Sequence, residues 1–232
     1  MASNETINEL LQSTDSAESI EYLNSYLAEK QKTLDGLADD ASELDRAFLQ
    51  LDIAEALVGV GRSEECWELA RKAFDIFLAN EEWEAAVQCC DALYQSGQPA
   101  SLSALGQGVW LAVTYPIDPQ LSINMLGYVV DETPGKADGA AVAAIVAHYI
   151  ADMRTEGDKH RSMTFVTNQM LANVAREHSG INNQEEMDVW LEKLQLLDPE
   201  IFLPRLSLVL GAIVPQDQWW FDRDALREKI PG

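Results

Sequence analysis

The fold is decided by residues 51–97, which read LDIAEALVGVGRSEECWELARKAFDIFLANEEWEAAVQCCDALYQSG. Apolar and small residues recur there every three or four positions, which is the period of an α-helix. Gly61 and Gly97 lie 36 positions apart, each just after one of these helical runs. Glycine at the end of a helix supplies the left-handed conformation that lets the chain reverse. The stretch therefore predicts consecutive helix–turn–helix units.

The small residues in this stretch sit where two helices must approach closely. The positions that carry the pattern are Ile53, Ala54, Leu57, Gly61, Cys66, Ala70 and Ala73. Over residues 47–97 this pattern resembles the tetratricopeptide repeat family. That family has aliphatic, small and large residues in its first helix, glycine in the turn and small residues in its second helix. Gly106 departs from the family, which has an aromatic or aliphatic residue there. The resemblance implies antiparallel helical hairpins stacked as an α-α superhelix.

The rest of the chain continues the helical pattern, and it predicts about 12 helices and no strand. Three helix starts have strong signals: Asp118-Pro119, Asp198-Pro199, and Asn183 with Glu186 in capping-box spacing. One earlier helix is expected to begin around Ser42 and another to be capped by Ser63, and Asn4 and Ser16 are expected to cap two still earlier helices. Residues 139–154 are rich in alanine, which predicts a closely packed central helix.

The domain organisation has two readings. The loop DETPGKAD at residues 131–138 is the best candidate boundary because it combines proline, glycine and charged residues. It would separate an acidic, tetratricopeptide-like region at 1–130 from a helical region at 131–232 that packs on it. One continuous domain is the alternative.

The charge balance restricts the partners of this chain. Its 232 residues include 16 basic and 39 acidic side chains, for a net charge of −23. This charge repels phosphate backbones and anionic lipid surfaces, so it argues against binding to nucleic acid or membranes. A basic or extended segment of another protein is the expected partner, and a homodimer stays open. An alternative of equal weight is that the charge only keeps the protein in solution.

The expected compartment is the cytoplasm. The three cysteines are an odd number and two of them are adjacent, which does not fit a secreted disulfide framework. The first residues lack the pattern of a signal peptide, and no apolar run is long enough to span a bilayer.

Catalytic and cofactor motifs are absent from the sequence, so no cofactor is expected and the chain is predicted not to be an enzyme. The alternative hypothesis is an all-helical metal-binding protein or enzyme. Its candidate ligands are His148, Asp152, Glu156 and His160, which form two pairs spaced four residues apart around one turn. Neither pair matches a known metal-binding helix motif, and a helix with matching ligands is missing.

The predicted function is therefore that of a noncatalytic interaction protein: an adaptor, an assembly factor or a dedicated chaperone that binds a partner segment in a helical groove. The expected groove residues are Gln50, Glu55, Glu84 and Gln88. A basic cluster is a candidate anion or acidic-partner site, with internal salt bridges as its alternative; it comprises Arg154, Lys159, His160 and Arg161. The C-terminal candidates for partner binding are Trp219, Trp220, Phe221 and Arg223. Aromatic residues there are also expected to cap the open end of the helical stack.

Overall fold

The structure is a computed structural model that describes residues 17–38 and 40–230. In these residues it contains eleven α-helices, one short 3-10 helix (η1) and no strand, so the predicted all-α class is confirmed. The α-helices are α2 (Ala17–Asp35), α3 (Glu43–Gly59), α4 (Ser63–Ala79), α5 (Trp83–Gln95), α6 (Ser101–Thr114), α7 (Pro119–Glu132), α8 (Asp138–Arg154), α9 (Gly157–Ser179), α10 (Gln184–Lys193), α11 (Pro199–Ile213) and α12 (Arg223–Arg227). The helix expected near Asn4 and the cap expected at Ser16 lie outside the described residues.

The chain forms two compact units, Met1–Ala104 and Leu105–Gly232. The division falls inside α6 rather than in a loop. The loop at residues 131–138, where a boundary was expected, connects α7 to α8 within the second unit.

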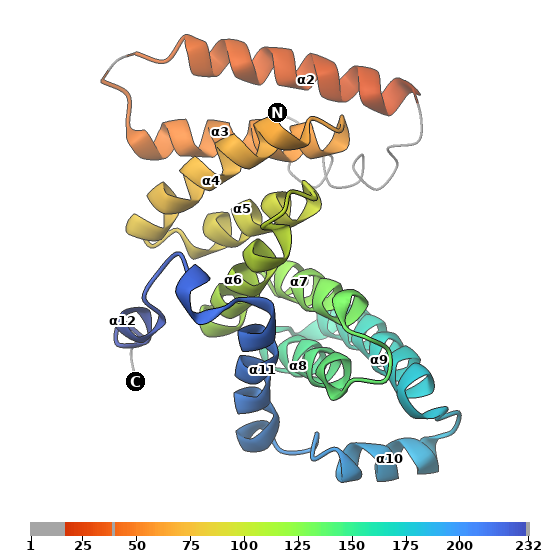
Figure 1. Cartoon of the computed structure of the whole chain (residues 1–232). Coiled ribbons are helices and arrows are strands. Elements are labelled where there is room, and N and C mark those ends of the chain that lie inside the picture. The colour runs from red at the N-terminus through yellow and green to blue at the C-terminus, as the bar shows by residue number, and fades with distance from the viewer. Residues whose placement is uncertain (1–16, 39, 231–232) are drawn as a thin grey trace. The chain divides into compact units, whose positions relative to one another are not determined.

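In the first unit, neighbouring helices pack against one another (Figure 1). Helix α3 contacts α2, α4 and α5, so it lies at the centre of this part of the chain. Six residues of the repeat-like pattern, which lie on α3 and α4, are almost fully buried, namely Ile53, Ala54, Leu57, Cys66, Ala70 and Ala73. The small residues of the pattern are therefore used as expected, to bring helices close together.

In the second unit, α8 is the central helix. It contacts α7, α9 and α11, and α7 also contacts α9. The alanines of α8 lie in these contacts and are buried, namely Ala140, Ala141, Ala143, Ala144 and Ala147. The prediction of a closely packed central helix is confirmed. Three neighbours fit around α8 because its side chains are too short to hold them away.

Most of the predicted helix starts are confirmed by hydrogen bonds from the first turn. The side chains of Ser42, Asp118, Asn183 and Asp198 each accept a bond from a backbone N–H two or three residues later. The cap predicted at Ser63 is wrong, because Ser63 is already the first residue of α4. The preceding turn ends with a bond from the Arg62 N–H to the Leu57 carbonyl, which leaves Arg62 in the capping position.

One turn conformation occurs three times in the described residues, after α3, α4 and α10. In the first, the N–H groups of residues 60, 61 and 62 bond to the carbonyls of residues 56, 58 and 57. Residues 80–82 and 194–196 repeat these offsets. The middle residue has a left-handed backbone each time, with φ of 74° at Gly61, 60° at Glu81 and 56° at Gln195. Only the first of these turns has glycine at this position, and glycine adopts a left-handed backbone without strain.

Substitutions at the middle position of this turn should therefore have opposite effects. We expect Gln195→Gly to stabilise the protein by about 0.5–1 kcal/mol, since it removes side-chain strain. We expect Gly61→Ala to destabilise it by about 1 kcal/mol for the same reason. Urea unfolding followed by far-UV circular dichroism measures both, with Gln195→Ala as a control that should stay close to wild type. A shift of the two midpoints in the same direction would contradict this account.

Candidate functional site

The C-terminal segment of the second unit is fixed against α6 by a buried glutamine. Gln107 is fully buried, and its amide nitrogen donates to the Gln218 carbonyl at 3.2 Å. Its amide oxygen accepts from the Trp220 N–H at 2.8 Å. Further along, the Tyr115 hydroxyl donates to the Leu226 carbonyl at 3.0 Å. Because both polar ends of the Gln107 amide are satisfied by this segment, detaching it would leave a buried amide without partners.

Helix α6 also approaches the end of α11 very closely. A Cβ atom at position 106 would lie 2.4 Å from a side-chain carbon of Val214, so only glycine fits there. This contact accounts for glycine at position 106, where the resemblance implied an aromatic or aliphatic residue. The position is needed for close packing within the second unit.

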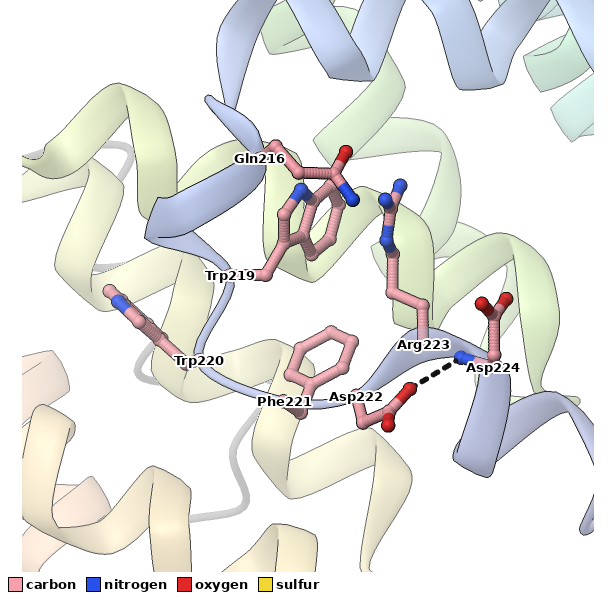
Figure 2. A pocket seen from close by; sticks show the side chains of 7 residues that line it. All are labelled: Gln216, Trp219, Trp220, Phe221, Asp222, Arg223 and Asp224. Carbon is pink, nitrogen blue, oxygen red and sulfur yellow. Dashed lines mark hydrogen bonds between the residues drawn. The ribbon is translucent and has the colours of Figure 1, made fainter.

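The segment after α11 surrounds a hollow of about 460 Å³ (Figure 2). Its lining consists of Gln216, Trp219, Trp220, Phe221, Asp222, Arg223 and Asp224. The guanidinium carbon of Arg223 lies 4.1 Å from the centre of the Trp219 ring, which is a cation–π contact. The Asp222 carboxylate accepts from the Asp224 N–H at 3.0 Å and so caps α12. The hollow is therefore lined by aromatic rings and by the positively charged Arg223 side chain, which is positioned by the Trp219 ring.

The aromatic rings of this segment differ in their surroundings. The Phe221 ring lies between those of Trp110 and Trp219, with centroid distances of 5.3 Å and 5.7 Å. Trp220 points away from this group in Figure 2. All three aromatic residues of the segment are half-buried, as is Arg223. The segment thus covers part of α6, while its tryptophans keep part of their surface exposed.

The predicted basic cluster is engaged in contacts within the second unit. Arg154 donates to the carbonyls of Ala112 and Val113 at 2.8 Å each, which satisfies backbone groups at the end of α6. Burial lowers the pKa of Arg154 from its usual value. Lys159 pairs with Asp118 at 2.9 Å.

The other two members of the basic cluster also have nearby acidic residues. Arg161 pairs with Asp158 on the first turn of α9. His160 lies 3.8 Å from the Asp152 carboxylate. The arrangement places acidic groups beside Lys159, His160 and Arg161, as the salt-bridge alternative expects.

The four candidate metal ligands are not brought into one group. The His148 Nδ1 lies 3.0 Å from the Thr167 hydroxyl, and burial lowers the pKa of this histidine. His160 contacts Asp152 at its Nε2 and the Thr155 hydroxyl, at 3.4 Å, at its Nδ1. Glu156 is exposed at the start of α9. In the part of the chain that the structure describes, no group of three or more His, Cys, Asp or Glu side chains is placed to hold a metal ion.

The four predicted groove residues lie on α3 and α5, which contact each other in the first unit. Glu55 and Gln88 are half-buried and Glu84 is exposed. Gln50 is also half-buried, but it points about 140° away from Glu55 around α3, given 100° per residue. The helical arrangement therefore separates Gln50 from Glu55, and Asp91 of α5 is the group that lies near Glu55 instead.

Glu55 has an unusual electrostatic environment. Burial, followed by the negative charges of Asp52 and Asp91, raises its pKa from 4.5 to about 8. The Asp52 carboxylate pairs with Lys30 of α2, whose amine also lies 5.1 Å from the Tyr26 ring centre. The Glu55 carboxyl is consequently protonated in the folded protein at neutral pH.

The cysteines of the first unit lie near this group and are buried. Burial raises the pKa of the Cys66 thiol to about 12, and it raises those of Cys89 and Cys90 as well. Nucleophilic chemistry needs a thiolate, so these protonated thiols serve as small side chains in the helix contacts.

Several residues of the C-terminal site were not singled out from the sequence. Gln107 and Tyr115 hold the segment, and Trp110 packs on Phe221. One signal was present, since Gln107 is a lone amide within the otherwise apolar stretch ALGQGVWLAV. A polar residue in a buried helix needs a partner, but its position does not say which partner it has.

The raised pKa of Glu55 predicts a pH dependence of stability. Between its unfolded pKa of 4.5 and its folded pKa of about 8, the folded state holds a proton that the unfolded state has released. Stability should therefore fall as pH rises through this range. We expect Glu55→Gln to remove most of this fall and to stabilise the protein at pH 8 by about 2 kcal/mol, a value reduced for partial exposure.

Urea unfolding at a series of pH values measures this effect. Glu84→Gln makes the same chemical change at an exposed position of the first unit and should keep the wild-type pH dependence. If Glu55→Gln and Glu84→Gln give the same profile, Glu55 is not the group responsible.

Comparison of the chain with protein-family models, with curated proteins and with solved structures finds no match to any of them. Within the described residues, no helix is both long and apolar enough to cross a membrane.

Proposed function

We propose that this chain is a noncatalytic, tetratricopeptide-like interaction protein that binds a segment of another protein at the C-terminal hollow. The observation that carries the proposal is the stacked pair of Trp219 and Arg223, with 4.1 Å between guanidinium and ring centre, half-exposed at the edge of the hollow. Tryptophan and arginine are the residues most enriched at the energetic centres of protein interfaces. An adaptor, an assembly factor and a dedicated chaperone are the concrete forms of this function.

The rigid support of the hollow favours binding. Gln107 fixes the backbone on both sides of Trp219, at Gln218 and Trp220. The Phe221 ring packs against the Trp219 ring in an edge-to-face arrangement, with a centroid distance of 5.7 Å. Ordering flexible side chains is a major cost of association, so a surface that is already ordered binds more tightly.

The charge of the protein favours a basic partner segment. The net charge of −23 attracts cations over distances of about 10 Å at ordinary salt concentrations. At the hollow itself, Asp222 and Asp224 are exposed beside the aromatic surface. A segment that carries lysine or arginine next to an apolar side chain matches this arrangement, and added salt should weaken its binding.

The double variant Trp219→Ala/Arg223→Ala tests the hollow as the binding site. We expect it to lose partners that wild-type protein captures from a lysate of the source cells, as quantified by mass spectrometry. For a purified partner, titration calorimetry should show binding weaker by roughly thirtyfold or more, because interface centres of this type contribute about 2 kcal/mol or more.

The matched control is Arg161→Ala/Phe165→Ala, which removes an exposed arginine and an exposed aromatic residue from α9 of the same unit. This control should capture and bind as wild type does. Far-UV circular dichroism and thermal unfolding establish that both variants are folded. Equal capture by wild type and the Trp219→Ala/Arg223→Ala variant would refute the hollow as the site.

The first unit has a second candidate surface for the same function, on α3 and α5. Glu84, Gln88 and Asp91 follow one another at helical spacing on α5, and Asp91 lies near Glu55 of α3. These residues give the face an acidic character that suits an extended basic segment.

Replacing Glu84 and Gln88 with lysine tests this second surface. We expect Glu84→Lys/Gln88→Lys to weaken binding of a basic partner by roughly tenfold, mainly at low salt, because it reverses the local charge. Titration calorimetry at two salt concentrations measures the change. Unchanged affinity at low salt would remove α3 and α5 from the binding surface and leave the hollow alone.

A further inference from the structure

Helix α10 is anchored in the second unit by one buried side chain. The helix connects α9 to α11 (Figure 1), and of its ten residues, all of which the structure describes, only Trp190 is buried. The Trp190 indole N–H donates to the Nδ1 of His178 on α9 at 3.2 Å. The two rings meet edge to face with a centroid distance of 5.7 Å. The position of α10 therefore depends on the contact between Trp190 and His178.

The other ring nitrogen of His178 faces a carboxylate. The His178 Nε2 lies 3.2 Å from the Asp138 carboxylate at the start of α8, and the second oxygen of this carboxylate lies 3.2 Å from the Arg205 guanidinium of α11. Because Nδ1 accepts from Trp190, the neutral ring carries its proton on Nε2 and donates it to Asp138. Helices α8 and α11 thus contribute charged groups to this network, and α10 contributes the neutral indole. Only 13% of the His178 side chain is exposed.

The Nδ1 of His178 has a second neighbour, the Ser179 hydroxyl, at 2.6 Å. Ser179 and Trp190 therefore both approach the single lone pair of this nitrogen. The two groups differ in their chemistry, because a hydroxyl can donate or accept a hydrogen bond, whereas an indole N–H can only donate. When Nδ1 gains a proton, the Ser179 oxygen can accept from it. The Trp190 N–H then faces another donor.

The charge of Asp138 decides which group moves when His178 becomes protonated. A positively charged imidazolium binds a carboxylate more strongly than a neutral ring does, so His178 stays in place beside α8. Both nitrogens of an imidazolium are donors, so no rotation of the ring restores an acceptor to Trp190. A buried donor that loses its partner is costly. Trp190 is therefore the side chain that leaves its buried position.

The chain on either side of α10 is suited to this movement. Gly180, which follows α9, has a φ of 70°, and glycine can change its backbone conformation more readily than other residues. After α10, Arg205 donates to the Leu194 carbonyl, and the Leu196 side chain is buried. The chain is thus held at residues 194–196, so α10 can move about this end with Gly180 as its second pivot.

We propose that Asp138, His178, Ser179 and Trp190 form a pH switch, which holds α10 against α9 at neutral pH and releases it when His178 is protonated in mildly acidic solution. Histidine side chains ordinarily gain their proton near pH 6.5, so the release takes place as the pH falls from about 8 to about 5. The switch acts on the edge of the second unit, and it does not depend on partner binding at the C-terminal hollow.

Nuclear magnetic resonance of the full chain tests the proposal. Each tryptophan gives its own indole N–H resonance, and Trp190→Phe identifies that of Trp190. We expect protection of the Trp190 indole N–H against hydrogen exchange to fall by roughly tenfold or more between pH 8 and pH 5, after correction for the pH dependence of exchange itself. The midpoint of this fall should coincide with the titration of the His178 ring. Far-UV circular dichroism over the same range should show that the protein stays folded.

Three variants separate the switch from a general effect of acid. His178→Asn keeps an acceptor close to the position of Nδ1 but does not titrate, so Trp190 should stay protected at pH 5. The matched control His160→Asn removes another histidine of α9 and should respond as wild type does. Ser179→Ala removes the acceptor for the protonated ring, so the midpoint should move to lower pH by about half a unit.

Ser179 is exposed, so Ser179→Ala tests the switch even if His178→Asn is unstable. Lasting protection of Trp190 in wild type at pH 5 would overturn the proposal. The same loss of protection in folded His178→Asn as in wild type, or an unchanged midpoint in Ser179→Ala, would also overturn it.

Discussion

Close approach between helices, made possible by very small side chains, is the constraint on which the whole structure depends. In the first unit, Ala54, Cys66 and Ala73 lie in the contacts of α3 and α4 and are fully buried. In the second unit, the alanines of α8 allow three other helices to surround it. Dispersion contacts and burial of apolar surface both require this proximity, and a larger residue at these positions would force the helices apart. Even the C-terminal site depends on it, because Gly106 lets the end of α11 reach α6.

Much of this fold was readable in the sequence because its signals are local. A cap such as Asp118 or Asn183 acts on backbone groups two or three residues away, so the spacing alone is enough. The small residues of α8 likewise predict tight packing without naming the neighbours. The prediction failed at Ser63, where the hydrogen bonds of the preceding turn decide the helix start. The left-handed backbones at Glu81 and Gln195 could not be predicted from the sequence either, since neither glutamate nor glutamine favours this conformation.

The candidate site was only partly readable, because its supports are distant in sequence. Composition drew attention to the aromatic residues of the C-terminal segment and to Arg223. Yet Gln107, which bonds to the Trp220 backbone, and Trp110, which packs on Phe221, lie more than a hundred residues earlier. Charge clustering drew attention to Arg154, whose role is to satisfy backbone carbonyls of α6. Sequence reveals which side chains carry charge or aromatic surface. Which groups they contact depends on tertiary packing, and no local pattern encodes that.

The pairing of Gln107 with the backbone of Trp220 also has a consequence for how the protein is made. The two residues are 113 positions apart, and ribosomes add about 5–20 residues per second. Helix α6 is therefore synthesised on the order of 10 s before the segment that satisfies its buried amide. During that interval the surface of α6 that will hold Phe221 is open to other proteins in the cell. Biogenesis of the second unit thus has a defined vulnerable period, which ends when the last aromatic residues emerge and dock.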